Sequence, residues 1–339
     1  MNKKLKIFLF TFLYVPITTV LLGETLFIFH HFYKFNTLFD SRSLEPDSEL
    51  GWTSRADFSL DYQTLDAGGA SYEINYHTVA KGFKEYGDVS TTKKKLLVIG
   101  DSFTQARQVS NDKTYYSYID RDKYEVFVYG AGGHGSYQEL QILLKYWDQI
   151  KPDLVVWQFC RNDLADNYFP IDSASAFSGI ILDRPYRKFR RSDKDNFYSF
   201  SRIFWPSRFL DFTLSKMLSR FNDKDIWKEL EKEGKGHKDL KGSIAETAEI
   251  LKLVRSKIGK VPVVSFGVDS HPLYLEIFRN LSESVNFHYL DSIPLSIQRV
   301  ERSGTIVRAL DGGHWNERGH QIAGLQLNSS LKVLDRRQR

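Results

Sequence analysis

Short runs of almost continuous apolar residues recur through the middle and the C-terminal part of the sequence. They lie at residues 95–100 (KLLVIG), 124–129 (YEVFVY), 153–159 (DLVVWQF) and 261–268 (VPVVSFGV), with a shorter run at 287–290. Segments with helical character lie between and after them, at 115–119, 137–150, 243–258, 272–281 and 316–334. Buried strands that alternate with helices are typical of a parallel sheet covered on both faces. We therefore expect an α/β domain with three layers, α/β/α, around a central parallel sheet.

The N-terminus has a different pattern. Lys3, Lys4 and Lys6 precede an uncharged run over 7–23, and after Glu24 an apolar stretch resumes to residue 29. A helix over this run is about 25 Å long, enough for a short membrane span. We expect residues 1–33 to be a single-pass membrane anchor with a cytoplasmic N-terminus, which places the rest of the chain outside the cytoplasm, periplasmic or extracellular. The alternative is a cleaved signal peptide, but the sequence around residue 24 is a poor cleavage site.

Two further segments interrupt the simple alternation. Residues 34–93 are expected to form a stalk and a small β-rich extension, with strand-like runs at 58–62 and 72–76 on either side of a Gly-Gly turn. The main α/β domain is expected over 94–339, with an insertion at about 164–242 that could cover the sheet edge as a lid. The insertion contains a basic cluster, which is either a solvated surface or a contact for anionic glycan or lipid headgroups: Arg184, Arg187, Lys188, Arg190 and Arg191.

Composition excludes several classes of site. The chain of 339 residues has one cysteine, so neither an intramolecular disulfide nor a zinc site built from cysteines is possible. The formal net charge of +5 is modest, and nucleic-acid binding is not expected without a clustered basic face. No cofactor or metal ion is expected: the glycine-rich loop after residue 129 does not match a dinucleotide-binding pattern, and Asp163 and Asp166 alone would bind a metal ion weakly.

Candidate catalytic residues follow the first strand and precede the last helix. Ser102 comes directly after the strand at 95–100, and Asp311 and His314 share one short loop near the C-terminus. The carboxyl ends of parallel strands meet at one edge of the sheet, where ligands bind. A serine hydroxyl needs a base to take its proton, and a carboxylate can orient that base. The pattern predicts Ser102 as nucleophile, His314 as base and Asp311 as its orienting acid.

Two more segments at the same edge predict an oxyanion hole. The loop Gly130-Ala131-Gly132-Gly133-His134-Gly135 follows the second strand, and Asn162 follows the third. A glycine-rich turn exposes backbone N–H groups, and an asparagine side chain donates from its amide. With the N–H of Ser102, they can stabilise a tetrahedral intermediate. Gly132 and Gly135 compete with Gly133 for this role, and the position after the strand favours Gly133.

The four blocks taken in order resemble those of the GDSL or SGNH hydrolases. Ser102, Gly133, Asn162 and His314 match the four family positions, with Asp311 three residues before the histidine. The resemblance runs from about residue 94 to 334 without the insertion, and it implies a flavodoxin-like sheet and a serine esterase. Residues 50–52 and 75–83 are similar to segments of membrane-tethered members associated with polysaccharide O-acetylation, which implies a substrate carrying O-acetyl groups on sugar. The serine lacks a G-x-S-x-G elbow, which argues against the α/β-hydrolase fold.

The expected function is ester hydrolysis, of an acylated small molecule or a glycan, through an acyl-serine intermediate. The alternatives are an O-acetyltransferase of cell-envelope polysaccharide, a lipase or thioesterase, and a glycan-binding component of an assembly machine without activity. Protein partners are not predicted. Several other residues are expected to be structural: Asp101 in the turn, Cys160 as a small buried side chain, His271 lining the site or capping a helix, and His320 in packing or at the surface.

Overall fold

The computed structural model describes residues 10–35, 43–47, 49–168, 171 and 226–337. They fall into two units, one containing residues 10–35 and the other containing the remaining described residues. The described part of the first unit consists of a π-helical turn, η1 (Phe10–Tyr14), and helix α2 (Val15–Phe35). Among the described residues, no helix combines the length and the apolar character that a membrane crossing requires. This differs from the anchor expected over residues 1–33, in which Glu24 divides the apolar sequence and residues 1–9 lie outside the described part.

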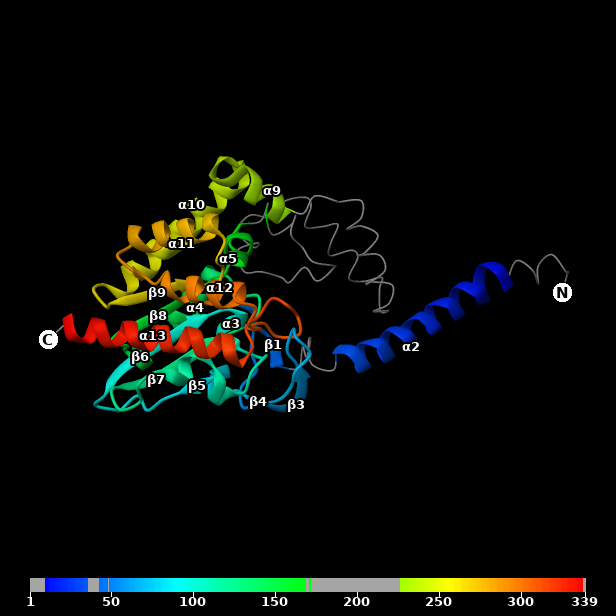
Figure 1. Ribbon diagram of the computed structural model, residues 1–339, viewed down its shortest axis with the longest axis horizontal. Helices are drawn as coiled ribbons and strands as arrows, with labels where there is room; N and C mark the ends of the chain where they lie inside the picture. The colour runs from blue at the N-terminus through cyan, green and yellow to red at the C-terminus, as the bar shows by residue number, and fades with distance from the viewer. Residues whose placement is uncertain (1–9, 36–42, 48, 169–170, 172–225, 338–339) are drawn as a thin grey trace. The chain divides into compact units, whose positions relative to one another are not determined.

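The second unit is built on a six-stranded sheet (Figure 1). All neighbouring strands in it are parallel except β5, which pairs antiparallel with β7 at one edge. The strands in their order across the sheet are β10 (His288–Tyr289), β9 (Val263–Gly267), β8 (Leu154–Phe159), β6 (Lys94–Gly100), β7 (Tyr124–Gly130) and β5 (Glu85–Tyr86). Apart from β5, this is the flavodoxin-like order, and it confirms the predicted α/β class with a mostly parallel central sheet.

The helices of this unit follow the strands as crossovers and caps. Short helical segments follow β6 and β8: α3 (Ser102–Gln105), η4 (Asn111–Lys113), η5 (Tyr115–Tyr118) and α5 (Arg161–Asp166). The longer helices are α4 (Ser136–Ile150), α10 (Lys238–Ile258), α11 (Pro272–Ser284), α12 (Ser292–Arg302) and α13 (Glu317–Arg337). Helix α9 (Ile226–Glu233) and the turn η7 (Gly234–Gly236) precede α10. Most of the expected insertion, including its basic cluster, lies outside the described residues, so the expected lid stays a prediction.

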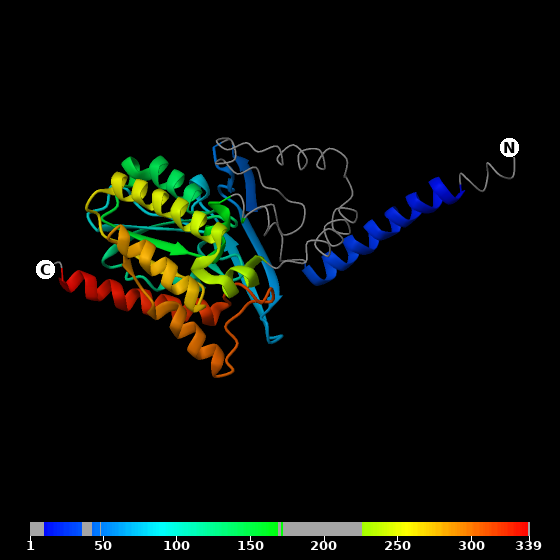
Figure 2. The same ribbon diagram turned by 90° about the horizontal axis from the view of Figure 1, so that it is seen from above.

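Alternation along the strands produces two cores, one on each face of the sheet. Leu97 and Ile99 of β6 belong to a cluster that includes residues of α4, α10 and α11, whereas Leu96 and Val98 belong to a cluster that includes residues of α12 and α13. Figure 2 shows α4 and α10 on one side of the strands and α12 and α13 on the other. The sheet is therefore the middle layer of three.

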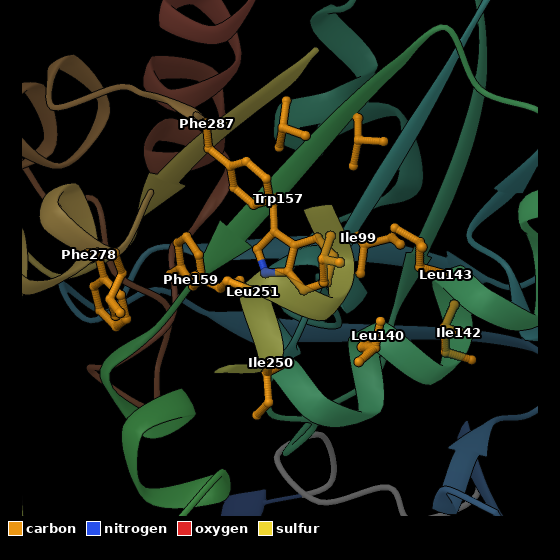
Figure 3. Close-up of a cluster of buried hydrophobic side chains, with 14 of the residues drawn as sticks. Ile99, Leu140, Ile142, Leu143, Trp157, Phe159, Ile250, Leu251, Phe278 and Phe287 are labelled. Carbon is orange, nitrogen blue, oxygen red and sulfur yellow. The ribbon is translucent and has the colours of Figure 1, made fainter. Parts of the chain in front are cut away.

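Trp157 of β8 lies at the centre of the first cluster (Figure 3). Its side chain is fully buried, and Ile99, Leu251 and Phe287 surround it. Burying a large aromatic side chain stabilises a fold by roughly 2–3 kcal/mol. Residues from four separate segments meet here, so this packing fixes the relative positions of the central strands that lead to the site.

The N-terminal extension forms two small antiparallel sheets. One pairs β1 (Leu44–Asp47) with β2 (Gly51–Ser54), and the other pairs β3 (Ser59–Leu65) with β4 (Ser71–His77). The turn η3 (Ala80–Gly82) then leads into β5. The hairpin of β3 and β4 contacts the main sheet domain at the loop after α3: the hydroxyl of Tyr72 donates to the carbonyl of Gln108 at 2.8 Å. Asp66, the residue after β3, also forms an isolated antiparallel β-bridge with Ala309, in the loop that precedes α13.

Candidate active site

Ser102 is the first residue of α3, which begins two residues beyond the end of β6. Asp101 caps this helix, because its carboxylate accepts a hydrogen bond from the N–H of Phe103 at 3.0 Å. The glycine at the end of β6 allows α3 to pack closely against the strand, since a Cβ on Gly100 would lie 2.2 Å from the Thr104 hydroxyl oxygen. The apolar strand, the glycine and the capping aspartate thus present the serine at the carboxyl edge of the sheet.

His314 and Asp311 lie on one loop that is folded back on itself. The Oδ1 atom of Asp311 accepts hydrogen bonds from the N–H groups of Gly313 and His314, each at 2.9 Å. Gly312, which follows Asp311, has a φ of 71°, a conformation that glycine adopts without strain. The loop therefore brings the carboxylate of residue 311 and the ring of residue 314 to the same side.

A continuous chain of hydrogen bonds joins the three side chains. The Nδ1 atom of His314 lies 2.6 Å from Asp311 Oδ2, and its Nε2 atom lies 2.8 Å from Ser102 Oγ. When Nδ1 donates to the carboxylate, Nε2 is left to accept the proton of the serine hydroxyl. The structure thus brings together the three residues that the sequence selected for nucleophile, base and acid, and their geometry is that of a serine triad.

Asp311 is held in its ionised form. Burial acts to raise its pKa, but the hydrogen bonds and charge of His314 and the N–H of Gly313 outweigh burial and bring the pKa to about 2. The carboxylate is therefore negative at neutral pH and can stabilise the imidazolium that forms when a serine proton is transferred to the ring. The ring of Phe103 packs against the imidazole, with centroids 4.9 Å apart, and limits its movement.

Neighbouring side chains hold the histidine loop in place. Arg308 donates from its guanidinium to the carbonyl of Gly313 at 2.7 Å and also pairs with Glu301. Gln108 donates to Asp311 Oδ2 at 3.3 Å. Sequence reasoning missed both residues, because nothing local in the sequence connects them to the loop.

The glycine-rich loop after β7 lies beside the serine. Gly100 and Gly130 are register partners at the ends of β6 and β7, so the two following loops leave the sheet side by side. A Cβ on Gly132 would lie 3.8 Å from the Cβ of Ser102, and the N–H of Gly132 donates to the side chain of Gln105 at 3.0 Å. Gly133 follows with a φ of 75°. The proposed contribution of its N–H to an oxyanion hole stays a prediction.

Asn162 is the second residue of α5, which begins two residues beyond the end of β8. Its Nδ2 atom donates to Oδ2 of Asp166 at 2.8 Å. Burial raises the pKa of the Asp101 carboxyl, and the nearby side chain of Asn162 partly opposes this rise. The amide is therefore adjacent to the residue that precedes the serine, and its part in an oxyanion hole likewise stays a prediction.

Several carboxyl groups are buried behind these loops. Burial, with the neighbouring carboxylates, raises the pKa of Asp163 and of Glu139 well above their usual ranges. Asp163 accepts hydrogen bonds from the hydroxyl of Ser136 at 2.9 Å and from the N–H of Cys160 at 2.8 Å. Among the described residues, no group of histidine, cysteine and acidic side chains is arranged to hold a metal ion.

Strand β2 supports the glycine-rich loop from outside the main sheet. The indole N–H of Trp52 donates to the carbonyl of Gly132 at 2.9 Å, and the carbonyl of Trp52 lies 3.0 Å from Nε2 of His134. The hydroxyl of Ser54 donates to the carbonyl of Gly130 at 2.8 Å. His134 is fully buried in these contacts, so it packs beneath the loop and does not line the site.

The remaining candidates have structural positions. His271 caps α11 by accepting from the N–H of Leu273 at 3.3 Å. His320 is buried and accepts from the N–H of Tyr115 at 3.2 Å, and burial together with the nearby cations lowers its pKa to about 3. Burial raises the pKa of the Cys160 thiol well above its usual value, so this cysteine is not a thiolate at neutral pH.

The comparisons with known proteins give weak similarities. No protein-family model matches the chain, and no curated protein sequence matches it. Among solved structures, the psychrotrophic esterase EstA from Pseudoalteromonas sp. is 10% identical with a TM-score of 0.39, and the alignment covers 71% of this chain and 98% of the esterase. A lipase/acylhydrolase from Enterococcus faecalis is 16% identical with a TM-score of 0.40, covering 71% of this chain and 96% of that one.

An acetylxylan esterase, Axe2 from Geobacillus stearothermophilus, is 13% identical with a TM-score of 0.36, and the alignment covers 69% of this chain and 92% of the esterase. These three proteins are esterases or acylhydrolases by name. At these identities and TM-scores the similarities assign neither a family nor an activity to the chain, and the function is inferred from the geometry of the site.

Proposed function

We propose that the protein is a serine-dependent ester hydrolase that forms an acyl intermediate on Ser102. One observation carries this proposal: the unbroken chain of hydrogen bonds from Ser102 Oγ through His314 to Asp311, at 2.8 and 2.6 Å. Such a chain activates a hydroxyl that is otherwise a poor nucleophile. The orientation of the imidazole by an ionised carboxylate is the feature that a chance contact between a serine and a histidine lacks.

The mechanism has two steps. In the first, Ser102 Oγ bonds to the ester carbonyl carbon while His314 Nε2 takes its proton. The protonated His314 then gives this proton to the leaving alcohol oxygen as the carbon–oxygen bond breaks. In the second step a water molecule attacks the acyl-serine, His314 takes the water proton and returns it to Oγ, and the free acid leaves.

Charge on the carbonyl oxygen must be stabilised in both steps. We assign this role to the N–H groups of Ser102 and Gly133 and to the amide of Asn162. The positions of the glycine-rich loop and of α5 on either side of the β6 terminus support the assignment. Removing one donor of this kind lowers turnover by roughly 100- to 1,000-fold.

The test compares wild-type protein with Ser102→Ala on p-nitrophenyl acetate. We expect the substitution to remove measurable turnover while the thermal unfolding midpoint changes little, because the serine hydroxyl is only half-buried. A folded Ser102→Ala protein that hydrolyses the ester at the wild-type rate would refute the proposal.

For the natural substrate we propose an O-acetylated carbohydrate. The support is the similarity of residues 50–52 and 75–83 to proteins associated with polysaccharide O-acetylation, together with the contact between Trp52 and the glycine-rich loop. Release of acetate from an acetylated oligosaccharide, lost in Ser102→Ala, is the expected result. Transfer of acetyl from a donor to a glycan without free acetate would instead identify an acetyltransferase.

The location of the domain outside the cytoplasm is a separate proposal, supported by the three lysines that precede the apolar N-terminal run. A fusion of the full chain to a reporter that is active only outside the cytoplasm tests it. Activity of the reporter is expected, and an inactive but stable fusion would contradict it.

A further inference from the structure

We propose that Asp166 is a positioning residue that holds the amide of Asn162 with its nitrogen toward the reacting carbonyl oxygen; the inference rests on the proposed ester hydrolysis. The two residues lie one turn apart on α5, and Asn162 Nδ2 donates to Asp166 Oδ2 at 2.8 Å. A carboxylate oxygen accepts this bond, so the contact is made by the NH₂ end of the amide and not by its oxygen.

The selection matters because the two ends of an asparagine amide have opposite polarity. The NH₂ group has two hydrogens, so the bond to Asp166 leaves the second to meet another acceptor on the side of the group that lies near Asp101. Rotation of the amide by half a turn would exchange this hydrogen for the oxygen. An amide oxygen facing a developing oxyanion would repel it and would add to the barrier that the donor lowers.

Asp166 is itself fixed by the packing around it. Its residue is 6% exposed, and a Cβ on Gly135 would lie only 2.6 Å from its own Cβ, so the start of α4 closes over it. Two hydrogen bonds tie α5 to the same turn of α4: Ser136 Oγ to Asp163 at 2.9 Å, and the N–H of Tyr137 to Asn167 at 3.1 Å. These contacts hold the part of α5 that contains Asp166 against the start of α4.

Asp163 does not take the same part, although it lies closer to Asn162 in the sequence. Its two oxygens accept from the hydroxyl of Ser136 and the N–H of Cys160. These bonds join the strand end to α4. They act on the backbone of the turn, whereas the bond of Asp166 acts on the Asn162 side chain.

The test is a double-mutant cycle on p-nitrophenyl acetate hydrolysis. In the wild-type background we expect Asp166→Leu to lower kcat by about 10- to 100-fold with KM changed by less than about 3-fold, because misplacing a transition-state donor affects turnover more than binding. Asp166→Asn retains an acceptor but permits both orientations of the Asn162 amide. Its kcat is therefore expected to lie between those of the wild-type protein and Asp166→Leu. In the Asn162→Ala background, Asp166→Leu should change kcat by less than about 3-fold.

Thr247→Val is the matched control, because it also removes one buried hydrogen bond near the end of α5, from Asn167 to the Thr247 hydroxyl at 3.1 Å. Its kcat is expected to stay within about 3-fold of wild type at a similar loss of stability. The inference is overturned if Asp166→Leu lowers kcat by the same factor with and without Asn162, or if the control loses equal activity. Failure of ester hydrolysis itself is seen separately, as wild-type protein no more active than Ser102→Ala.

Discussion

The imidazole Nε2 of His314 lies 2.8 Å from the hydroxyl oxygen of Ser102, although 212 positions separate the two residues in the chain. The contact depends on the sheet, which places the end of β6 beside the loop that precedes α13. It also depends on Asp311, whose carboxylate binds both the ring and the backbone of the histidine.

Asp311→Asn is expected to lower kcat by about 1,000- to 10,000-fold. An amide in place of the carboxylate removes the negative charge that favours protonated His314, and its NH₂ group favours the wrong imidazole tautomer. Steady-state hydrolysis of p-nitrophenyl acetate measures the effect. A loss below about 10-fold in a folded variant would mean that the carboxylate does not orient the base.

Trp52→Phe tests the support that β2 gives to the glycine-rich loop. The substitution keeps an aromatic ring but removes the hydrogen bond to the carbonyl of Gly132, so we expect kcat to fall by about 3- to 10-fold and the free energy of unfolding by about 1 kcal/mol. Thr53→Val is the control. The Thr53 hydroxyl lies 2.6 Å from the hydroxyl of Tyr129 in β7, so the substitution removes a hydrogen bond of β2 that is not made to the glycine-rich loop. Equal losses of kcat in the two variants would show that β2 acts only through general stability.

Two alanine substitutions, one at the last residue of β7 and one in the loop after it, should have different consequences. A Cβ on Gly130 would lie 2.3 Å from the backbone nitrogen of Gln105, so Gly130→Ala is expected to reduce the yield of folded protein severely. A Cβ on Gly132 would meet only the tip of the Gln105 side chain, at 3.0 Å, and the Cβ of Ser102, at 3.8 Å. Gly132→Ala should therefore fold, with a loss of about 1–2 kcal/mol, and lose activity. Thermal unfolding and kcat together distinguish the two, and a stable, fully active Gly130→Ala protein would contradict the packing described.

His320 should make the fold sensitive to acid. Its pKa in the folded protein is about 3, below the ordinary value of 6.5, because of burial and nearby positive charge. Between these two pH values the unfolded chain binds a proton at this residue and the folded chain does not, so lowering the pH favours unfolding. From pH 6.5 to 4.5 the wild-type protein should lose about 2–3 kcal/mol more stability than His320→Gln. Urea unfolding at several pH values measures this, and parallel curves for the two proteins would exclude the effect.

Much of the sheet could be predicted because its strands have a strong local signal. The run at 153–159 is apolar at almost every position, as a strand covered on both faces must be, and it forms β8. Strand β5 was missed, because Glu85 and Tyr86 are only two residues and pair at an edge. Helix α12 was also missed, although Ile293, Ile297 and Val300 follow helical spacing and pack against the second core.

Some residues of the site could be predicted from local sequence motifs, and others are defined only by contacts between distant parts of the chain. Ser102, Asp311 and His314 lie in short motifs at the ends of predicted elements, so their residue types and order were enough to select them. The roles of Trp52 and Asp166 could not be predicted. Trp52 contacts Gly132 across 80 positions of the chain, and the contact of Asp166 with Asn162 depends on how α5 packs. Side-chain contacts of this kind follow from the assembled fold and leave no pattern in the sequence.

The covalent state of Ser102 during turnover shows directly whether this residue is the nucleophile. Wild-type protein is mixed with p-nitrophenyl acetate, quenched in acid within milliseconds, digested and analysed by mass spectrometry. We predict an added acetyl group on the peptide that contains Ser102, and none on the corresponding peptide of Ser102→Ala. Sustained ester hydrolysis by wild-type protein with the acetyl group on another residue, or undiminished hydrolysis by Ser102→Ala, would contradict the assignment of Ser102 as the nucleophile.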